Sequence, residues 1–434
     1  MNTNAKKNCV LAYSGGLDTS AIVPWLIEQG YTVHAVLVDV GQDEDLQALK
    51  DKALRYGAKT AVISDMRPAM YAHVIPYAIG LGATYEGNYR LGTALARPFI
   101  ALAQVERARE LGGATLVHGA TGKGNDQIRF EFAYKSLLPG AEVLAPWKVW
   151  EFSGRKDLIA YLASQGLDAD FAAAKDYSMD ENFWHLSVEG GALEDPTAVV
   201  DIEEILGDVQ HRFASGGANG AAQSVSITLK NGVPVAIDGK PANLPTIVGT
   251  LNQAYRHAPW GWDLVIENRF TGIKSRGLYI NPAAKLLHTA VDALARTVFN
   301  KPLFDEYTRL GVQYGAMLYR GEFFSAQRLT LQAAADTLLA KLNGTVTVQL
   351  APALYVAKID TPAAIFRHSL STFEKSDYQH IDAQGFINLT WLSLIGQPFA
   401  EQSHAGALET DAEAASDLST AESLPGGGLV SSAA

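Results

Sequence analysis

The first 165 residues alternate short apolar runs with stretches of helical periodicity, and this alternation restricts the fold more than any other feature. The expected strands are Asn8–Tyr13, Thr32–Asp39, Lys59–Ser64, Thr115–His118 and Glu142–Leu144. Helices are expected at Ser20–Gln29 and Asp45–Tyr56, each followed by a glycine that can end a helix in a left-handed conformation. The alternation predicts an α/β domain with a parallel sheet wrapped by helices and a ligand at the carboxyl ends of its strands.

Beyond about Leu167 the pattern changes to mixed helices and strands. Two alternating runs within Ser224–Asp238 flank Asn231-Gly232, a strong signal for a two-residue hairpin. Helices are expected at Leu244–His257, Ala283–Phe299, Phe304–Tyr319 and Ser325–Leu342, and strands within Thr345–Asp360, broken near Pro352. The chain is thus predicted to have a nucleotide-binding domain at 1–167, an α+β domain at 168–400, and a tail at 401–434 that is flexible or ordered on a neighbouring subunit.

Composition excludes several classes of function. A length of 434 residues exceeds what one core usually supports, which favours two domains. The formal net charge of -11 argues against nucleic acid or an anionic membrane as the main partner. Cys9 is the only cysteine, so no internal disulfide forms. The first apolar run, Cys9–Tyr13, is too short for a signal peptide or a membrane span, and we expect a cytoplasmic protein.

The strongest local motif is Ser14–Ser20 (SGGLDTS), between an apolar strand and an apolar helix. Its paired glycines let backbone amides approach phosphate oxygens, and the helix that follows adds unpaired amides and a positive dipole end. The alternative is an ordinary tight turn capped by Asp18 or Thr19. The motif is neither a Walker A loop nor the glycine pattern of dinucleotide-binding folds. It predicts a phosphate-binding loop of another kind.

A second segment, Gly119–Glu131 (GATGKGNDQIRFE), follows another strand and opens a helix. Its glycines could admit phosphate, while Thr121, Asn125, Asp126 and Arg129 offer groups that suit a zwitterionic ligand. A surface loop with an Asp126 helix cap and Arg129 paired to a carboxylate is an equally good interpretation from the residues alone.

The first loop resembles the pyrophosphate-binding loop of N-type ATP pyrophosphatases, and the second segment is nearly identical to the signature of argininosuccinate synthases. Three further blocks resemble that family in the same order: Tyr89–Pro98, Tyr177–Ser187 and Glu267–Tyr279. The resemblance therefore covers most of the chain. It implies an ATP pyrophosphatase-type domain followed by a synthetase and multimerisation domain, a homotetramer, and the ATP- and Mg²⁺-dependent ligation of citrulline and aspartate through a citrullyl-adenylate.

The resemblance also implies site residues by position. ATP would be bound by Ala12, Tyr13, Ser14, Gly15, Gly16, Leu17, Asp18, Thr19, Ser20, Val38 and Gly119. Aspartate would be bound by Thr121, Asn125 and Asp126. Citrulline would be bound by Tyr89, Asn125, Arg129, Ser178, Ser187, Glu267 and Tyr279. Asp18 and Asp126 are the expected catalytic residues, Asp18 supporting the magnesium site and Asp126 orienting the aspartate amine.

Two positions depart from the family pattern. Ala94 stands where many members carry a hydroxyl residue that contacts citrulline, and Phe183 replaces a usual leucine. No transition-metal site is expected, and His118 and His185 are given no catalytic role.

Each site residue taken alone has a simpler interpretation. Tyr89 and Tyr279 could be ordinary half-buried tyrosines, Ser178 a helix cap, and Glu267 and Arg269 a surface ion pair. Two other functions fit part of the sequence: a different N-type ATP pyrophosphatase that adenylates another substrate, and a non-catalytic ATP-sensing module. The latter would bind ATP without releasing pyrophosphate.

Overall fold

The computed structural model describes residues 7–122, 124–167, 177–208, 223–351, 353–365, 368–371 and 377–395. The residues up to Ile365 form one compact unit, and those from Phe366 form a second. The described part of the second unit consists of α13 (His368–Ser371) and α14 (His380–Ile395). Pro352 and the predicted tail at 401–434 lie outside the described residues. Within the described ranges, no helix combines the length and apolar character needed to cross a membrane.

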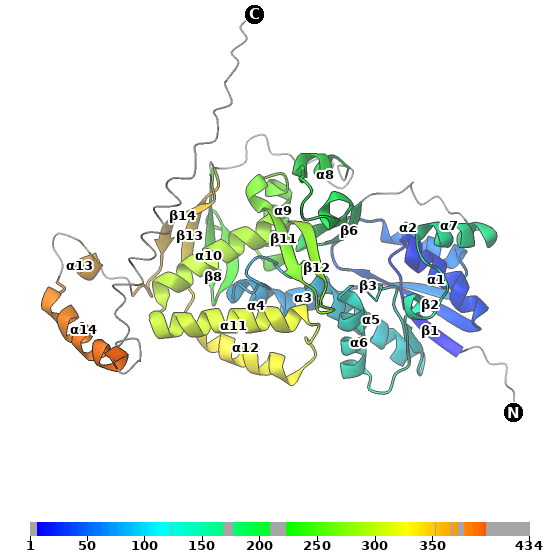
Figure 1. The fold of residues 1–434 in the computed structure, drawn as a ribbon, viewed down its shortest axis with the longest axis horizontal. Coiled ribbons are helices and arrows are strands. Elements are labelled where there is room, and N and C mark those ends of the chain that lie inside the picture. The colour runs from blue at the N-terminus through cyan, green and yellow to red at the C-terminus, as the bar shows by residue number, and fades with distance from the viewer. Residues whose placement is uncertain are drawn as a thin grey trace, which may run out of the picture. The chain divides into compact units, whose positions relative to one another are not determined.

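A parallel five-stranded sheet forms the amino-terminal part of the first unit (Figure 1). Its strands are β1 (Lys7–Ala12), β2 (Tyr31–Asp39), β3 (Thr60–Asp65), β4 (Thr115–Val117) and β5 (Val143–Leu144). Their order is β3-β2-β1-β4-β5, and all neighbouring pairs are parallel. The five predicted strands and the parallel sheet are confirmed, and the central strands β1, β2 and β4 are the ones buried between two layers of helices.

Helices cover both faces of this sheet. One face packs against α1 (Leu17–Glu28), α2 (Leu46–Arg55) and α7 (Arg155–Ser164), and the other against α5 (Gly92–Glu110) and α6 (Asp126–Leu137). The predicted first helix begins earlier than expected, because Gly16 is its N-cap residue and neither Asp18 nor Thr19 caps it. The second helix is capped by the Asp45 side chain, which accepts a hydrogen bond from the Ala48 amide.

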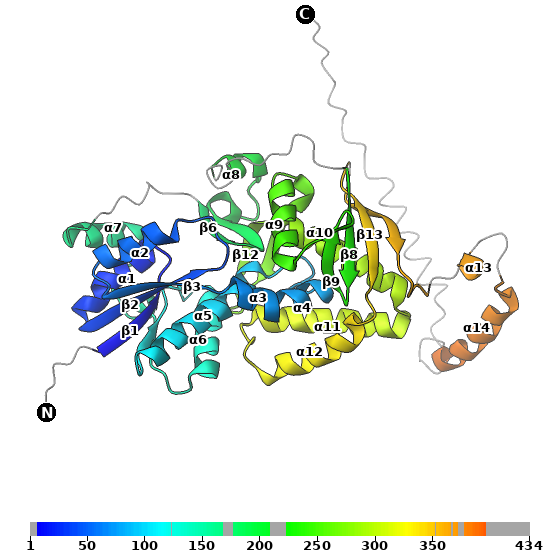
Figure 2. The same cartoon turned by 180° about the vertical axis from the view of Figure 1, so that it is seen from behind.

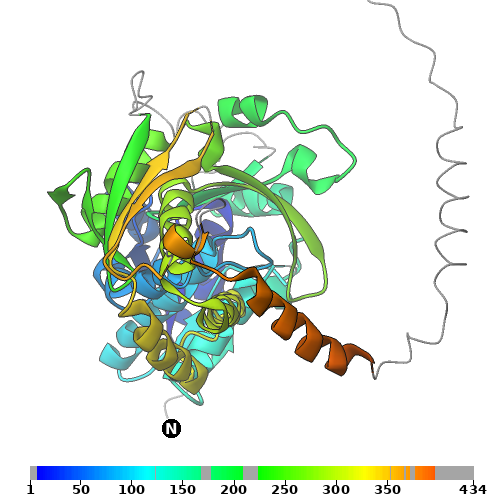
Figure 3. The same cartoon turned by 90° about the vertical axis from the view of Figure 1, so that its left-hand side faces the viewer.

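An antiparallel sheet of five strands dominates the carboxyl-terminal half of the first unit, and Figure 3 shows its green and orange strands side by side. Its strands are β8 (Ser224–Lys230), β9 (Val233–Ile237), β10 (Lys240–Pro241), β13 (Gly344–Gln349) and β14 (Tyr355–Asp360), in the order β10-β9-β8-β13-β14. The predicted hairpin is confirmed: Asn231 and Gly232 have φ angles of 51° and 72°. Helices α9 (Leu244–Tyr255) and α10 (Pro282–Val298) pack on this sheet.

A second antiparallel sheet carries two of the sequence blocks singled out above. Its order is β11 (Trp262–Asn268), β12 (Lys274–Ile280), β7 (His185–Gly190) and β6 (Tyr177–Asn182). In this sheet Ser187 lies opposite Tyr279, and Asp180 lies opposite Ser187. The block Tyr177–Ser187 therefore reaches the end of the block Glu267–Tyr279 through backbone pairing. The short helix α8 (Ile202–Asp208) lies in the chain between β7 and β11.

The two halves of the first unit share their larger apolar core. Helices α3 (Arg67–His73) and α4 (Ile75–Gly80) belong to the amino-terminal half. In Figure 2 they lie among α10, α11 (Lys301–Tyr319) and α12 (Ala326–Leu339). Buried Ile75 and Ile79 join one cluster with Leu287 and Leu318. The boundary after residue 167 stays a prediction, and the two predicted domains share this core.

Candidate active site

The phosphate loop lies at the carboxyl end of β1, where it turns into α1. Gly15 has a φ angle of +74°, and a Cβ atom built on it would lie 2.4 Å from Cδ2 of Leu49 on α2. Lys52, one turn further along α2, donates from Nζ to the Gly15 carbonyl at 2.9 Å. Ser14 Oγ lies 3.1 Å from Thr19 Oγ1, and Ser20 donates to the Gly15 carbonyl at 3.3 Å. The loop is therefore braced by α2 and by its own hydroxyls, and the Gly16 amide donates to Ser14 Oγ at 3.4 Å.

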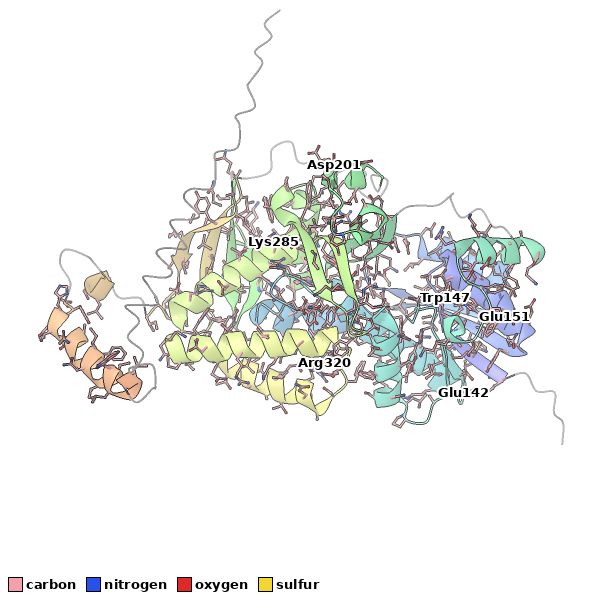
Figure 4. The ribbon with its side chains drawn as sticks, in the orientation of Figure 1. Glu142, Trp147, Glu151, Asp201, Lys285 and Arg320 are labelled. Carbon is pink, nitrogen blue, oxygen red and sulfur yellow. The ribbon has the colours of Figure 1, made fainter. Side chains whose placement is uncertain are left out.

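Asp18 lies in the first turn of α1, beside a tryptophan and an arginine. Burial raises the pKa of its carboxyl, an effect that the Arg155 guanidinium and the Trp147 indole oppose. Trp147, labelled in Figure 4, belongs to a short turn after β5. The carboxylate that the sequence assigned to the magnesium site is thus partly buried and lies next to a cation.

The second segment begins against the phosphate loop. A Cβ atom on Gly119 would lie 3.2 Å from both Thr19 Cγ2 and Ile22 Cδ1, so the end of β4 packs tightly against α1 at this glycine. Val38 is buried at the end of the neighbouring strand β2, and its carbonyl accepts a hydrogen bond from Gln42. The residues assigned to ATP by position therefore occupy the ends of three adjacent strands, β2, β1 and β4.

Two arginines enclose Asp126 at the start of α6. Arg97 Nε on α5 lies 2.8 Å from one carboxylate oxygen of Asp126, and Arg129 Nη1 lies 2.9 Å from the other. Arg97 also bonds Asp180 on β6 through Nη2 at 2.5 Å. Burial alone would raise the pKa of Asp126, but the two guanidinium groups outweigh it and hold the pKa below its ordinary value. Asp126 therefore remains ionised and fixed in position.

Asn125, the residue before Asp126, is held at both ends of its amide. Its Nδ2 donates to the hydroxyl of Tyr319 at 2.7 Å, and its Oδ1 accepts from the Phe270 amide at 2.8 Å. Arg129 is 3% exposed and donates from Nε to the Tyr319 carbonyl at 3.0 Å. The loop of the amino-terminal half is thereby tied to the end of α11 and to the turn between β11 and β12.

The tyrosines assigned to citrulline are buried together. The rings of Tyr89 and Tyr279 lie 4.8 Å apart, and Tyr89 meets the edge of Tyr319 at 5.9 Å. Ser187 is 3% exposed and faces Tyr279 across the β7–β12 pair. These tyrosines are too deeply buried to be the half-buried surface residues of the simpler interpretation.

Glu267 is the unusual carboxylate of this cluster. It is 5% exposed, and its Oε2 has no hydrogen-bond partner among the described residues. Burial raises its pKa to about 7, although the Arg129 guanidinium opposes the shift, and the neighbouring carboxylate of Glu189 raises it further. Arg269 pairs with Glu189 at 2.7 Å and Glu267 is buried, so the simpler interpretation of Glu267 and Arg269 as a surface ion pair does not hold.

The raised pKa of Glu267 predicts a pH dependence of stability. The folded protein keeps the proton up to about pH 7, whereas the unfolded chain releases it near 4.5. Between these two pH values the native state binds more protons than the unfolded chain. The stabilisation that the protonated Glu267 contributes is therefore fully present below pH 4.5 and is lost as the pH rises through 7. Above pH 7 the stabilisation lost in this way amounts to about 3 kcal/mol.

We expect Glu267→Gln to remove this slope, because the amide does not titrate. Urea unfolding at pH 5 and pH 8 measures it: the wild type should lose more free energy of unfolding across the interval than the variant. Equal losses in the two proteins would show that Glu267 does not titrate in this range.

Several assigned residues lie at the rim of this cluster. Ser178 lies on β6 opposite Glu189 and is exposed, so it does not cap a helix. Thr121 is exposed in the loop before α6, where its carbonyl accepts from the Gly124 amide at 3.4 Å.

Ala94 is fully buried on α5. His185 is also buried, and burial lowers its pKa to about 4, so it is neutral at physiological pH.

Sequence reasoning missed three residues of the cluster: Arg97, Asp180 and Tyr319. Arg97 and Asp180 stand inside two of the quoted blocks, but only the fold shows that they meet at Asp126. Tyr319 ends a predicted helix, and no motif marks it. No group of three or more His, Cys, Asp or Glu side chains arranged to hold a metal ion occurs within the described residues.

Two family models match this chain along most of its length. Residues 8–168 match the model described as the arginosuccinate synthase N-terminal HUP domain, and residues 177–395 match that of the arginosuccinate synthase C-terminal domain. The chain belongs to the argininosuccinate synthase family. Its parallel sheet is therefore a HUP domain, and the prediction of the family and of its α/β fold is confirmed.

Curated members of the argininosuccinate synthase family align with nearly the whole chain. The protein of that name from Caldicellulosiruptor saccharolyticus is 39% identical over 388 residues, which are 89% of this chain and 95% of the relative. The one from Moorella thermoacetica is 39% identical over 91% of this chain and 96% of its own length. The one from Leptospira biflexa is 40% identical over 90% and 97%.

Proposed function

We propose that this protein is an argininosuccinate synthase, which joins citrulline to aspartate at the expense of ATP and releases AMP and pyrophosphate. The observation that carries the proposal is the buried cluster beside the phosphate loop. There Asn125, Asp126 and Arg129 meet Glu267 and Tyr279 from the other half of the chain. Opposite charges and a carboxylate oxygen without a partner suit two zwitterionic amino acids.

ATP would lie along the ends of β1, β2 and β4. The amides of Gly15 and Gly16 and the amino-terminal end of α1 offer donors to its phosphates, and Ser14 and Thr19 add hydroxyls. Magnesium ions are commonly held by one or two carboxylates together with substrate phosphates, and Asp18 fits that role. Bound there, the ion would neutralise charge on the departing pyrophosphate.

The chemistry depends chiefly on positioning. In the first step the ureido oxygen of citrulline attacks the α phosphorus of ATP and pyrophosphate leaves, so the reacting oxygen must be held in line with that bond. Arg129, Glu267 and the two tyrosines would hold citrulline. In the second step the amine of aspartate attacks the activated carbon and AMP leaves. Asp126, fixed by two arginines, would orient that amine.

Pyrophosphate release tests the function directly. Purified protein is incubated with ATP and Mg²⁺ and with citrulline, aspartate, both or neither. We expect release that requires citrulline, with argininosuccinate and AMP formed only when aspartate is added. ATP binding without release under any condition would favour the ATP-sensing module, and release that ignores citrulline would favour an ATP pyrophosphatase with another substrate. No observation on the structure favours either alternative.

Ala94 allows a gain-of-affinity experiment. Because many family members carry a hydroxyl residue at this position, we expect Ala94→Ser to place a hydroxyl toward citrulline and to lower the KM for citrulline roughly fivefold. Ala96→Ser, equally buried on the same helix, is the control for the cost of a buried hydroxyl. An unchanged or higher KM for citrulline in Ala94→Ser would contradict the assignment.

The protein would act as a cytoplasmic homotetramer. Support for assembly comes from α14, which leaves Ile381, Phe386, Leu389, Trp391 and Leu392 exposed in the single chain. Native mass spectrometry would show the subunit number. We further propose domains at 1–167 and 168–400 with a tail at 401–434, in line with the limits of the two family models, 8–168 and 177–395.

A further inference from the structure

Tyr319 is the residue at which the two halves of the candidate site meet, although it belongs to none of the motifs. It is the last residue of α11, and it is fully buried. Arg320, the next residue, is labelled in Figure 4 and marks where α11 reaches the part of the molecule that carries α5 and α6. The side chain and the carbonyl of Tyr319 both contact residues assigned to the amino acid substrates.

The hydroxyl of Tyr319 is shared between the two halves. It accepts the hydrogen bond from Asn125 Nδ2 at 2.7 Å and donates its own proton to the Asn268 carbonyl at 3.2 Å. Asn125 belongs to the loop before α6, whereas Asn268 ends β11 and follows Glu267 directly. One hydroxyl thus sets the spacing between the loop that carries Asp126 and the strand that carries Glu267.

The ring of Tyr319 is fixed by other aromatic rings. It stacks on Tyr85 at 3.6 Å with an interplanar angle of 7°, and it meets Tyr89 edge-on. The guanidinium carbon of Arg129 lies 4.9 Å from its centre, and Arg129 Nε bonds the Tyr319 carbonyl. Arg129 is therefore oriented by the ring and by the backbone of the same residue.

The backbone after Tyr319 is built for this approach. Gly321 has a φ angle of +76°, and a Cβ atom there would lie 2.6 Å from the Cα atom of Arg129. Any other residue would push the end of α11 away from α6. The close contact and the buried hydroxyl together place Tyr319 within reach of Asn125 and Arg129.

We propose that Tyr319 is a positioning residue for both amino acid substrates, acting through Asn125 and Arg129 without contacting ATP. The proposal rests on the proposed function, since it takes Asn125 and Arg129 as substrate ligands. Tyr319 holds the Asn125 amide in the one orientation in which Nδ2 points to α11 and Oδ1 receives the Phe270 amide. The Asn125 amide is then already ordered before the ligands bind. Binding therefore does not have to supply the free energy of ordering it.

Tyr319→Phe separates the hydroxyl from the ring. The variant keeps the stack on Tyr85 and the carbonyl bond to Arg129, but it leaves the Asn125 amide without its buried partner. We expect the KM values for citrulline and aspartate to rise roughly tenfold, as the loss of the buried hydrogen bond from Asn125 implies. The KM for ATP should stay within about twofold, since the phosphate loop does not touch Tyr319 in the described structure.

Tyr314→Phe is the matched control. Tyr314 lies on the same helix, is also fully buried, and its hydroxyl accepts one hydrogen bond from Gln332 at 3.0 Å. Removing it should lower the free energy of unfolding by up to the amount that Tyr319→Phe does, which loses two hydrogen bonds, while all three KM values stay at the wild-type level. Two results would overturn the proposal and leave Tyr319 with a structural role only. In the first, Tyr319→Phe would lower the free energy of unfolding without changing any KM. In the second, it would raise the KM for ATP as much as the KM values for citrulline and aspartate.

A double-mutant cycle with Asn125→Ala tests the route of the effect. If Tyr319 acts through Asn125, adding Tyr319→Phe to Asn125→Ala should raise the amino acid KM values by less than about twofold further. Full additivity would overturn that route. Tyr85→Leu, which removes the stacked ring but spares the Tyr319 hydroxyl, is the second variant should Tyr319→Phe fold poorly. It should raise the same two KM values, and unchanged values would count against the proposal.

The wild-type reactions separate the two levels of inference. If the wild type forms no argininosuccinate from citrulline, aspartate and ATP, the proposed function fails before any variant is compared. If the wild type forms it and the Tyr319→Phe kinetics match those of Tyr314→Phe, only the role of Tyr319 fails.

Discussion

Replacing Asp126 with asparagine is expected to reduce kcat/KM roughly hundredfold or more and to raise the KM for aspartate. Asp126 pairs with Arg97 and Arg129, whose side chains are 16% and 4% exposed, so the neutral amide would leave Arg129 without this counter-charge and Arg97 with Asp180 alone. Removing one member of such a buried network costs about 3 kcal/mol of stability. The displaced guanidinium groups would also shift the start of α6, and displacements of about 1 Å can cost roughly hundredfold in rate.

Steady-state kinetics in each substrate and urea unfolding would measure these effects together. Asp305→Asn is the control, because Asp305 pairs with Lys301 on the exposed surface of α11, where the loss should be within about 0.5 kcal/mol and activity should not change. If Asp126→Asn kept the wild-type KM for aspartate, Asp126 would not orient the amine, and the arginine network would serve stability alone.

Replacing Gly15 with alanine is expected to raise the KM for ATP roughly thirtyfold or more. The alanine would have to adopt a left-handed conformation at φ +74°, and its Cβ atom would lie 2.4 Å from Leu49 Cδ2, so either the Leu49 side chain or the loop must shift where Lys52 bonds the Gly15 carbonyl. The phosphate-binding amides would move with the loop. The KM values for citrulline and aspartate should change much less, because their cluster is held by α6, β11 and α11.

Gly30→Ala provides the matched control for backbone strain. Gly30 follows α1 with a φ angle of +82°, and a Cβ atom there would meet nothing within 4 Å. The two variants thus share the cost of a left-handed alanine, about 1 kcal/mol, but only Gly15→Ala disturbs the loop. Equal KM values for ATP in both variants would show that the packing of Gly15 on Leu49 has no part in nucleotide binding.

The phosphate loop and the parallel sheet could be predicted because their signals are local. Val10 to Tyr13 is an apolar strand, and the SGGLDTS loop and an apolar helix follow within a few residues. The sheet of β6, β7, β11 and β12 carries polar residues at many positions, as in Tyr177–Asn182 and Lys274–Arg276, so its strands give no clear alternation. Those segments were recognised by resemblance to a family, and their strands were not predicted.

Contacts between distant residues could not be predicted from periodicity. Tyr319 meets Asn125 across 194 positions of the chain, and Arg97 meets Asp180 across 83. Nothing in the neighbourhood of either residue signals such a partner, because the contact depends on how α5, α6 and α11 pack. For the same reason, periodicity could not show that Arg269 pairs with Glu189 on β7 and not with Glu267, as in the simpler interpretation.

The shared core of the two halves sets the order in which the chain can fold during synthesis. When the ribosome has delivered the first 167 residues, Ile75 and Ile79 on α4 still lack their partners on α10 and α11, which lie more than a hundred residues further on. The nascent amino-terminal half therefore keeps an apolar surface exposed until α10 and α11 are synthesised, and this favours chaperone binding or aggregation. A gene truncated at that boundary would yield a fragment with the phosphate loop but without the means to cover α4.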